Sequence, residues 1–202
     1  DKHLNSVQII GTNGKGSTAA SLSSILIASG MNVGMYTSPH LVDLSERITI
    51  NNNKIDNNYI NYFINLFSEE IQELHCTFFE TLTVMAACFF KEKKVDVAIF
   101  ETGLGGRFDS VTACNARLQL FTKISMDHNH ILGDSIEAIS YEKAYAIQKK
   151  VPCISVNQDQ KVKFILDKLA KEQNTTINYI STEYSEEYSS PLLGHHQQQN
   201  IM

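Results

Sequence analysis

The order of hydrophobic and polar positions along the chain predicts strands that alternate with helices. Short β-branched runs bounded by glycine or polar residues predict strands, whereas apolar residues three to four apart, as at Leu22, Ile25 and Leu26, predict helices. The strands are expected at 7–10, 33–37, 95–100, 118–125, 152–156 and 177–180, with a hairpin at 47–55. The helices are expected at 17–29, 57–74, 78–93, 135–148 and 160–173. This alternation predicts an α/β fold with a mostly parallel sheet flanked by helices.

Length and charge narrow the function classes. The 202 residues carry 22 acidic side chains against 17 Lys and Arg, a net charge of -5, so no nucleic-acid partner is expected. No apolar run approaches the roughly 20 residues that a membrane-spanning helix needs, and the first residues lack the apolar core of a signal peptide. A cytoplasmic protein without a membrane partner is therefore expected. The 4 cysteines are widely spaced without a C-x-x-C pair, which predicts neither a zinc site nor a disulfide framework.

A glycine-rich loop joins the first expected strand to the first expected helix. The amides of such a loop cradle phosphate oxygens, its lysine adds a positive charge, and the amino terminus of the helix favours an anion. The loop departs from G-x-x-x-x-G-K-[ST], because two residues separate the first two glycines and a glycine follows the lysine. A nucleotide site is favoured over the alternative, a plain glycine turn. The residues predicted to bind it are Gly11, Thr12, Asn13, Gly14, Lys15, Gly16, Ser17 and Thr18.

Polar side chains follow three further strands at the point where each strand ends. Ser38 follows the second strand, Glu101 the third and His128 the fourth. The carboxyl ends of parallel strands share one edge of the sheet, where ligands bind in open α/β folds. Taken singly, a histidine there is more often structural, and a glutamate can cap a turn. Together they predict a site for Mg²⁺ bridging a nucleotide.

Eight segments, in order, resemble the folylpolyglutamate synthase and dihydrofolate synthase family. Through that family the chain resembles the wider Mur ligase superfamily, so the expected fold is a P-loop NTPase-like Mur ligase central domain. The segments are 11–18 (GTNGKGST), 37–41 (TSPHL), 46–48 (ERI), 77–80 (TFFE), 101–107 (ETGLGGR), 127–128 (DH), 142–144 (EKA) and 194–200 (GHHQQQN).

The resemblance implies an ATP-dependent amide ligase with ATP and Mg²⁺ as cofactors. Such an enzyme phosphorylates a carboxylate of dihydropteroate or a reduced folate, and the amino group of L-glutamate then displaces the phosphate. The implied catalytic residues are Lys15, Glu101, His128 and Lys143. Ser38 and Glu101 match one magnesium site, and Glu101, His128 and Lys143 match a second, at which the lysine is typically carbamylated. Without the resemblance, Lys143 would be interpreted as a solvated helix residue.

The resemblance also implies substrate contacts and further parts of the protein. Phe78 and Phe79, otherwise interpreted as core aromatics, would lie near the pterin ring, where a flat side chain can stack. The implied substrate-binding residues are Pro39, His40, Arg47, Phe78 and Phe79, and Asn200 is implied at the nucleotide. Residues 1–190 are expected to form the ATP-binding domain with pterin-site loops, and 191–202 a hinge toward a missing C-terminal α/β domain. The expected partners are small molecules, the chain a monomer, and the isolated chain a poor nucleotide binder.

Several positions depart from the family pattern, and alternatives follow from them. Val111 and Thr112 stand where Thr and Asn are usual, Tyr145 stands where Gly is usual, and the stretch 181–193 is short. A Mur-type ligase of a peptidoglycan precursor is one alternative, opposed by Gly16 and the TSPHL run. A non-catalytic nucleotide-binding module is the other, supported only by the departures. A simple GTPase is disfavoured because the chain has no N-K-x-D motif.

Overall fold

An eight-stranded sheet forms the frame of the computed structural model, which describes residues 4–126 and 133–180. The strands are β1 (Ser6–Ile10), β2 (Val33–Tyr36), β3 (Ile48–Ile50), β4 (Asn53–Lys54), β5 (Val97–Glu101), β6 (Leu118–Phe121), β7 (Cys153–Val156) and β8 (Ile177–Ile180). The helices are α1 (Lys15–Ala28), α2 (Asn57–Leu66), α3 (Ser68–Glu73), α4 (Phe78–Glu92), α6 (Ile136–Ala144) and α7 (Gln160–Glu172), with 3-10 turns η1 (Leu44–Arg47) and η2 (Ser110–Cys114).

The sheet is parallel except at one edge, as the sequence predicts. Its order is β4-β3-β2-β5-β1-β6-β7-β8, and only the β2–β3 and β3–β4 pairs are antiparallel. The first strand therefore lies at the centre, between β5 and β6. Because the six parallel strands point the same way, the loops that follow β1, β2, β5 and β6 share one edge of the sheet.

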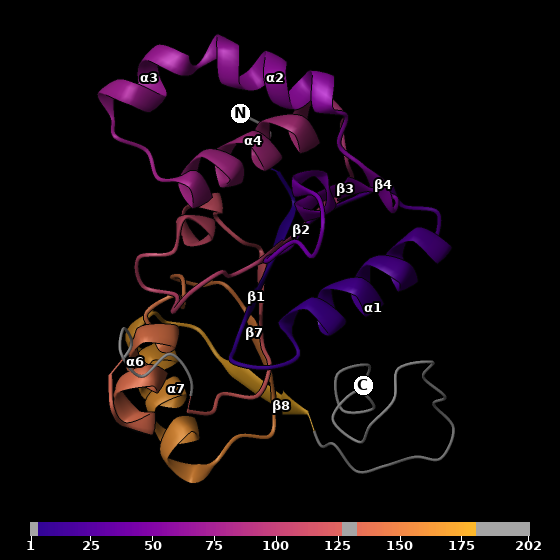
Figure 1. The fold of residues 1–202 in the computed structure, drawn as a ribbon. Coiled ribbons are helices and arrows are strands. Elements are labelled where there is room, and N and C mark those ends of the chain that lie inside the picture. The colour runs from indigo at the N-terminus through magenta and orange to yellow at the C-terminus, as the bar shows by residue number, and fades with distance from the viewer. Residues whose placement is uncertain (1–3, 127–132, 181–202) are drawn as a thin grey trace.

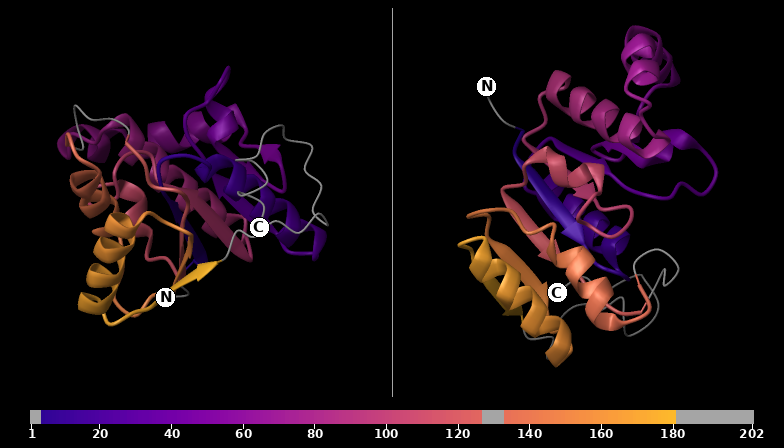
Figure 2. Two further views of the ribbon diagram at one scale, coloured as in Figure 1. Left: turned by 90° about the horizontal axis from the view of Figure 1, so that it is seen from below. Right: turned by 90° about the vertical axis from the view of Figure 1, so that its left-hand side faces the viewer.

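Helices cover both faces of the sheet (Figure 1). On one face α1 packs on Ile9, Val33 and Ile99. On the other face α4 packs over Ala98 and Phe100, and α6 with α7 covers the β6–β7 side. The helices α2 and α3 form an outer layer above α4, seen again from two further sides in Figure 2.

Three expected elements end more than one residue before their predicted ends. The helix expected at 57–74 divides at Phe67, whose φ of -111° leaves the helical range while its ring packs 4.8 Å from that of Phe63. The helix expected at 135–148 ends at Ala144, because the backbone beyond it bonds to a strand side chain, Gln119. The strand expected at 118–125 ends at Phe121, because the following residues bind the glycine-rich loop instead.

The structure shows the state of the cysteines and the character of the helices. All four cysteines are free thiols, as expected, and burial raises the pKa of the Cys153 thiol to about 12. Within residues 4–126 and 133–180, no helix combines the length and the apolar character that crossing a bilayer requires.

Gly34 in β2 is expected to tolerate no side chain. A Cβ atom there would lie 2.6 to 2.9 Å from the ring of Phe90, which is fully buried. The variant Gly34→Ala should lower the free energy of unfolding by about 1–3 kcal/mol, because overpacking forces the ring out of its position. Urea denaturation measures the loss, and Phe90→Leu in the same chain should recover part of it. Equal stability of Gly34→Ala and the parent would contradict this packing.

Candidate functional site

The glycine-rich loop turns sharply between β1 and α1. Gly14 precedes the helix with a φ of 85°, a left-handed conformation that favours glycine, and the first intrahelical bond runs from the Thr18 amide to the Gly14 carbonyl at 2.9 Å. The amides of Lys15, Gly16 and Ser17 precede that bond. They form the amino terminus of a 14-residue helix, where backbone N–H groups and the helix dipole favour an anion.

The loop is fixed to the chain that follows β6. The amides of Thr12 and Asn13 donate to the Lys123 carbonyl at 3.0 and 3.4 Å. The Thr12 hydroxyl donates to the Ser125 carbonyl at 3.0 Å and accepts from the Ser125 amide at 3.2 Å. These four bonds hold the entry to the loop, so its shape is set before any ligand binds.

Two lysines contact carbonyl oxygens of the loop. Lys15 Nζ donates to the Thr12 carbonyl at 3.1 Å, and Lys143 Nζ donates to the Gly11 carbonyl at 2.9 Å. Only 5% of the Lys143 surface is exposed. The interpretation of this lysine as a solvated helix residue is therefore wrong, because the end of α6 lies against the loop and directs the ammonium into it.

Glu101 ends β5 as a buried carboxylate beside the loop. It is 5% exposed, and the Ser38 amide donates to its Oε2 at 3.1 Å. A Cβ atom on Gly16 would lie 3.6 Å from the same oxygen, so the glycine after the lysine leaves the loop and the carboxylate close together. Burial raises the pKa of Glu101, and the Ser38 amide and the charge of Lys15 partly oppose that rise.

The expected magnesium ligands are described in part. Ser38 and Glu101 are neighbours, whereas His128 lies outside the described residues. Asn200, implied at the nucleotide, lies outside them too. Within the described ranges, no three His, Cys, Asp or Glu side chains gather closely enough to hold a metal ion. A buried carboxylate next to a serine is nonetheless an oxygen donor pair of the kind that Mg²⁺ takes when phosphate oxygens and water complete its shell.

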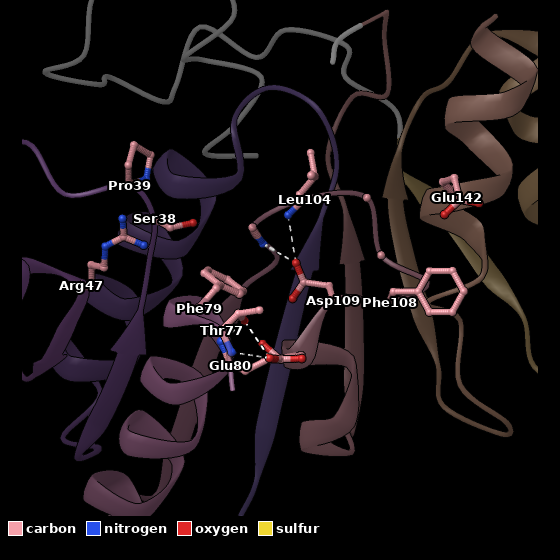
Figure 3. A pocket seen from close by; sticks show the side chains of 14 residues that line it. Ser38, Pro39, Arg47, Thr77, Phe79, Glu80, Leu104, Phe108, Asp109 and Glu142 are labelled. Atoms are coloured by element: carbon pink, nitrogen blue, oxygen red, sulfur yellow. Dashed lines mark hydrogen bonds between the residues drawn. The ribbon is translucent and has the colours of Figure 1, made fainter. Parts of the chain in front are cut away.

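An open cleft of about 820 Å³ lies at the same edge of the sheet (Figure 3). Of the predicted substrate-binding residues, Pro39, Arg47 and Phe79 line it. His40 and Phe78 do not line it but flank Arg47: Arg47 Nε donates to His40 Nδ1 at 2.8 Å, and its guanidinium lies 5.4 Å from the Phe78 ring centre. The lining residues are Ser38, Pro39, Arg47, Thr77, Phe79, Glu80, Gly103, Leu104, Gly105, Gly106, Phe108, Asp109, Ser110 and Glu142.

Phe79 forms the floor of the cleft at the start of α4. Thr77 and Glu80 form a capping box there, which fixes the first turn and with it the ring. The ring packs 5.6 Å from that of Tyr36. A Cβ atom on Gly103 would lie 2.6 Å from it, so the loop after β5 is in close contact with its edge. Phe78, by contrast, is 58% exposed, so its interpretation as a core aromatic is wrong.

Sequence reasoning did not single out four residues that shape the cleft: Leu104, Phe108, Asp109 and Glu142. Asp109 Oδ2 accepts from the amides of Gly103 and Leu104 at 2.9 Å each (Figure 3). Burial raises the pKa of Asp109, and the backbone amides bonded to it oppose that rise. The sequence signal for Asp109 is its position two residues after the ETGLGGR segment.

Arg107 does not line the cleft but contacts two residues that do, Phe108 and Glu142. Its guanidinium lies 4.9 Å from the Phe108 ring and 4.6 Å from the Tyr145 ring, and its Nη1 lies 3.9 Å from Glu142 Oε1. Tyr145, the departure from the family pattern, is 45% exposed and stacks on this arginine. The Tyr145 ring therefore lies against Arg107 and is partly exposed to solvent.

Comparisons with known proteins identify the family of the chain. A family described as the Mur ligase middle domain matches residues 9–199. The dihydrofolate synthase/folylpolyglutamate synthase of Bacillus subtilis is 39% identical over 77% of this chain, and the folylpolyglutamate synthase of Lacticaseibacillus casei is 35% identical over 75%. The chain spans 38% and 37% of the lengths of these two relatives.

Solved structures of the same enzymes share the fold. An FPGS–AMPPCP–folate complex has a TM-score of 0.90 and 27% identity, covering 98% of this chain and 55% of that one. Escherichia coli FolC in complex with DHPP and ADP has a TM-score of 0.87 and 27% identity, covering 98% and 52%. By its sequence and its fold the chain belongs to the Mur ligase family, as a middle domain of the folylpolyglutamate and dihydrofolate synthase type.

Proposed function

We propose that the chain is the ATP-binding part of a ligase that joins L-glutamate to dihydropteroate, to reduced folates, or to both. The observation that carries this proposal is the meeting of three features at one sheet edge: the glycine-rich loop, the buried Glu101 beside it, and the cleft that begins at Ser38. A phosphoryl donor on the loop and a carboxylate substrate in the cleft would meet there. The relatives' names supply the substrate class.

The proposed reaction has two steps. The γ-phosphoryl group of ATP passes to a carboxylate oxygen of the pterin or folate, which gives an acyl phosphate and ADP. The amino nitrogen of glutamate then attacks the acyl carbon, loses a proton and expels phosphate. Both steps need alignment and charge neutralisation more than covalent help from the protein, and Lys15 at the helix terminus would supply charge at the transferring phosphoryl group.

Ser38 and Glu101 would hold one Mg²⁺, and their adjacency and oxygen chemistry fit that ion. Glu101, His128 and Lys143 would hold a second, with Lys143 carbamylated. Such an ion neutralises the oxygens of the phosphates while transfer takes place. The protein's own contribution is to keep Glu101 buried and oriented through the Ser38 amide, and to hold Lys143 at the Gly11 carbonyl.

The cleft would take the flat ring system of the substrate. Phe79 offers a fixed aromatic face, Asp109 offers an acceptor beside it, and Arg47, held by His40 and Phe78, offers a positive charge at one end. Residues 1–190 would form this domain and 191–202 a hinge, with Asn200 at the nucleotide. The protein would act as a cytoplasmic monomer on ATP, glutamate and its pterin or folate substrate.

The test uses the full-length protein that carries this chain, with ATP, Mg²⁺ and glutamate. One sample receives dihydropteroate and a second receives tetrahydrofolate, and mass spectrometry detects products that are one glutamyl unit heavier. Addition in both samples establishes a bifunctional ligase, and addition in one restricts the substrate. If neither gains mass while ATP binds, the folate assignment fails, and a Mur-type substrate or a non-catalytic role replaces it.

A further inference from the structure

A buried network of glutamine and threonine side chains lies below the site, on the face of the sheet that carries α4 and α6. Gln8 from β1 and Gln119 from β6 face each other across the strand pair and are 1% and 0% exposed. Around them lie three residues with which they share hydrogen bonds: Thr102, Thr112 and Gln148. We call these five residues the glutamine network.

Two backbone groups fix the direction of the hydrogen bonds at one end of the network. The Ala146 carbonyl can only accept, so the amide nitrogen of Gln119 faces it, at 2.7 Å. The Gln148 amide can only donate, so the oxygen of Gln119 faces it, at 2.9 Å. The second hydrogen of Gln119 Nε2 then points to Gln8 Oε1 at 2.8 Å.

The same direction continues to the other end. Since Gln8 Oε1 accepts from Gln119, Gln8 Nε2 faces the hydroxyls of Thr102 and Thr112, at 3.3 and 2.9 Å. The Thr112 hydroxyl accepts from Gln8 and donates to the Gly106 carbonyl at 2.8 Å. One chain of bonds therefore runs from Gln119 through Gln8 to the segment after β5 that lines the cleft, residues 103–109, which we call the cleft loop. The donors and acceptors of this chain follow a single order.

The two ends of the network hold segments that also touch each other. The segment after α6 carries Ala146 and Gln148 and follows Lys143 directly, whereas the cleft loop carries Gly106. A Cβ atom on Gly106 would lie 3.0 Å from both the Lys143 carbonyl and the Ala146 Cβ, and the Arg107 amide donates to the Glu142 carbonyl at 2.9 Å. The cleft loop and the end of α6 are thus packed so closely that no side chain fits between them at Gly106.

We propose that Gln119 is a positioning residue, which holds Lys143 and the cleft loop in one mutual arrangement through the glutamine network. The proposal rests on the proposed function, because it is that reaction which needs Lys143 and the substrate cleft aligned. Gln119 itself lies below the rim and acts through Ala146, Gln148 and Gly106. A displacement of about 1 Å at a reacting centre costs on the order of 10²-fold in rate, so a buried support of this kind controls turnover.

The experiment compares three variants of the full-length protein. Gln119→Leu removes the bonds to Ala146, Gln148 and Gln8, and so disconnects the two ends of the network with little change in volume. Thr112→Val removes only the end at Gly106. Thr49→Val is the matched control, because it makes the same change at a buried threonine that lies in β3, away from the network. The ligation assay gives kcat and the KM for ATP, and hydrogen exchange with mass spectrometry follows peptides spanning 103–112 and 144–150.

Gln119→Leu should lower kcat about tenfold or more while the KM for ATP changes less than about threefold, since the glycine-rich loop keeps its own tethers. Exchange should become about tenfold faster in both peptides, whereas Thr112→Val should affect 103–112 more than 144–150. Thr49→Val should leave all these values unchanged. If Gln119→Leu behaves like Thr49→Val in exchange, the proposal is overturned. If the parent shows no ligation, the proposed function fails, and the exchange data alone decide whether the network holds the two segments.

Discussion

Replacement of Glu101 by glutamine is expected to lower the kcat of the proposed full-length ligase by about 10³-fold, because the Mg²⁺ proposed at this carboxylate would supply several kcal/mol of charge stabilisation. Glutamine keeps the shape of the side chain and can still accept from the Ser38 amide, which now reaches Oε2 at 3.1 Å. It lacks the negative charge that a divalent cation requires. Steady-state ligation over a range of Mg²⁺ concentrations measures the effect, and added Mg²⁺ should not restore the rate.

The same variant should be at least as stable as the parent at pH 7. Burial raises the pKa of Glu101, so the folded state disfavours the ionised form, and ionisation destabilises the fold once the pH exceeds the pKa of the unfolded chain. Removing the charge removes that cost. Activity could be lost because the carboxylate acts in the site or because it supports the fold, and thermal unfolding without ligands distinguishes the two. A lowered Tm would show that the carboxylate supports the fold, and would contradict its assignment to the site.

Gly11→Ala is expected to weaken nucleotide binding by about 10²-fold or more, which corresponds to at least about 2.7 kcal/mol. The new Cβ atom would overlap the hydroxyl of Thr122, which also donates to the Ile10 carbonyl at 3.4 Å. The loop would have to move away from β6, and its carbonyl would leave Lys143. Calorimetric titration of the full-length protein with a non-hydrolysable ATP analogue measures the affinity.

Two further variants identify the cause of that loss. Thr122→Ala in the Gly11→Ala background removes the overlapping hydroxyl and should recover part of the affinity. Gly30→Ala also introduces a side chain at a positive φ, 90°, but meets no atom within 4 Å, so it should cost stability without changing affinity. Full affinity in Gly11→Ala, or an equal loss in Gly30→Ala, would show that close approach to Thr122 does not set the shape of the loop.

The sequence predicts the frame of the molecule and the edge at which its chemistry lies. Alternating strands and helices imply the parallel sheet, and the rule that strand ends share one edge brings Ser38 and Glu101 together, 3.1 Å apart from amide to carboxylate. This reasoning works because it needs only the direction of the backbone. The motifs near the strand ends then identify the residue types at that edge.

Side-chain burial and direction are predicted less well. Lys143 has the pattern of an exposed helix residue, yet it is buried because α6 ends against the glycine-rich loop. Phe67 has the pattern of a helix interior, yet its φ of -111° ends α2 there. Gln8 and Gln119 have the pattern of solvent-facing strand positions, and only partners more than 25 residues away in sequence satisfy their amides. Such contacts leave no periodic signal in the sequence.

The hydrogen-bond donors and acceptors between Gln119 and Gly106 follow one fixed order, and this order limits how these positions can change in evolution. The Ala146 carbonyl can only accept and the Gln148 amide can only donate, so the orientation of Gln119 is fixed. A replacement at position 8 that presents a donor to Gln119 instead of an acceptor would leave a buried polar group unpaired. We therefore expect selection against single replacements of Gln8 or Gln119. Joint replacements that keep the order of donors and acceptors, or that make all of these positions apolar, should be tolerated. We expect positions 8, 112 and 119 to covary as a unit among relatives, independently of the glycine-rich loop above them.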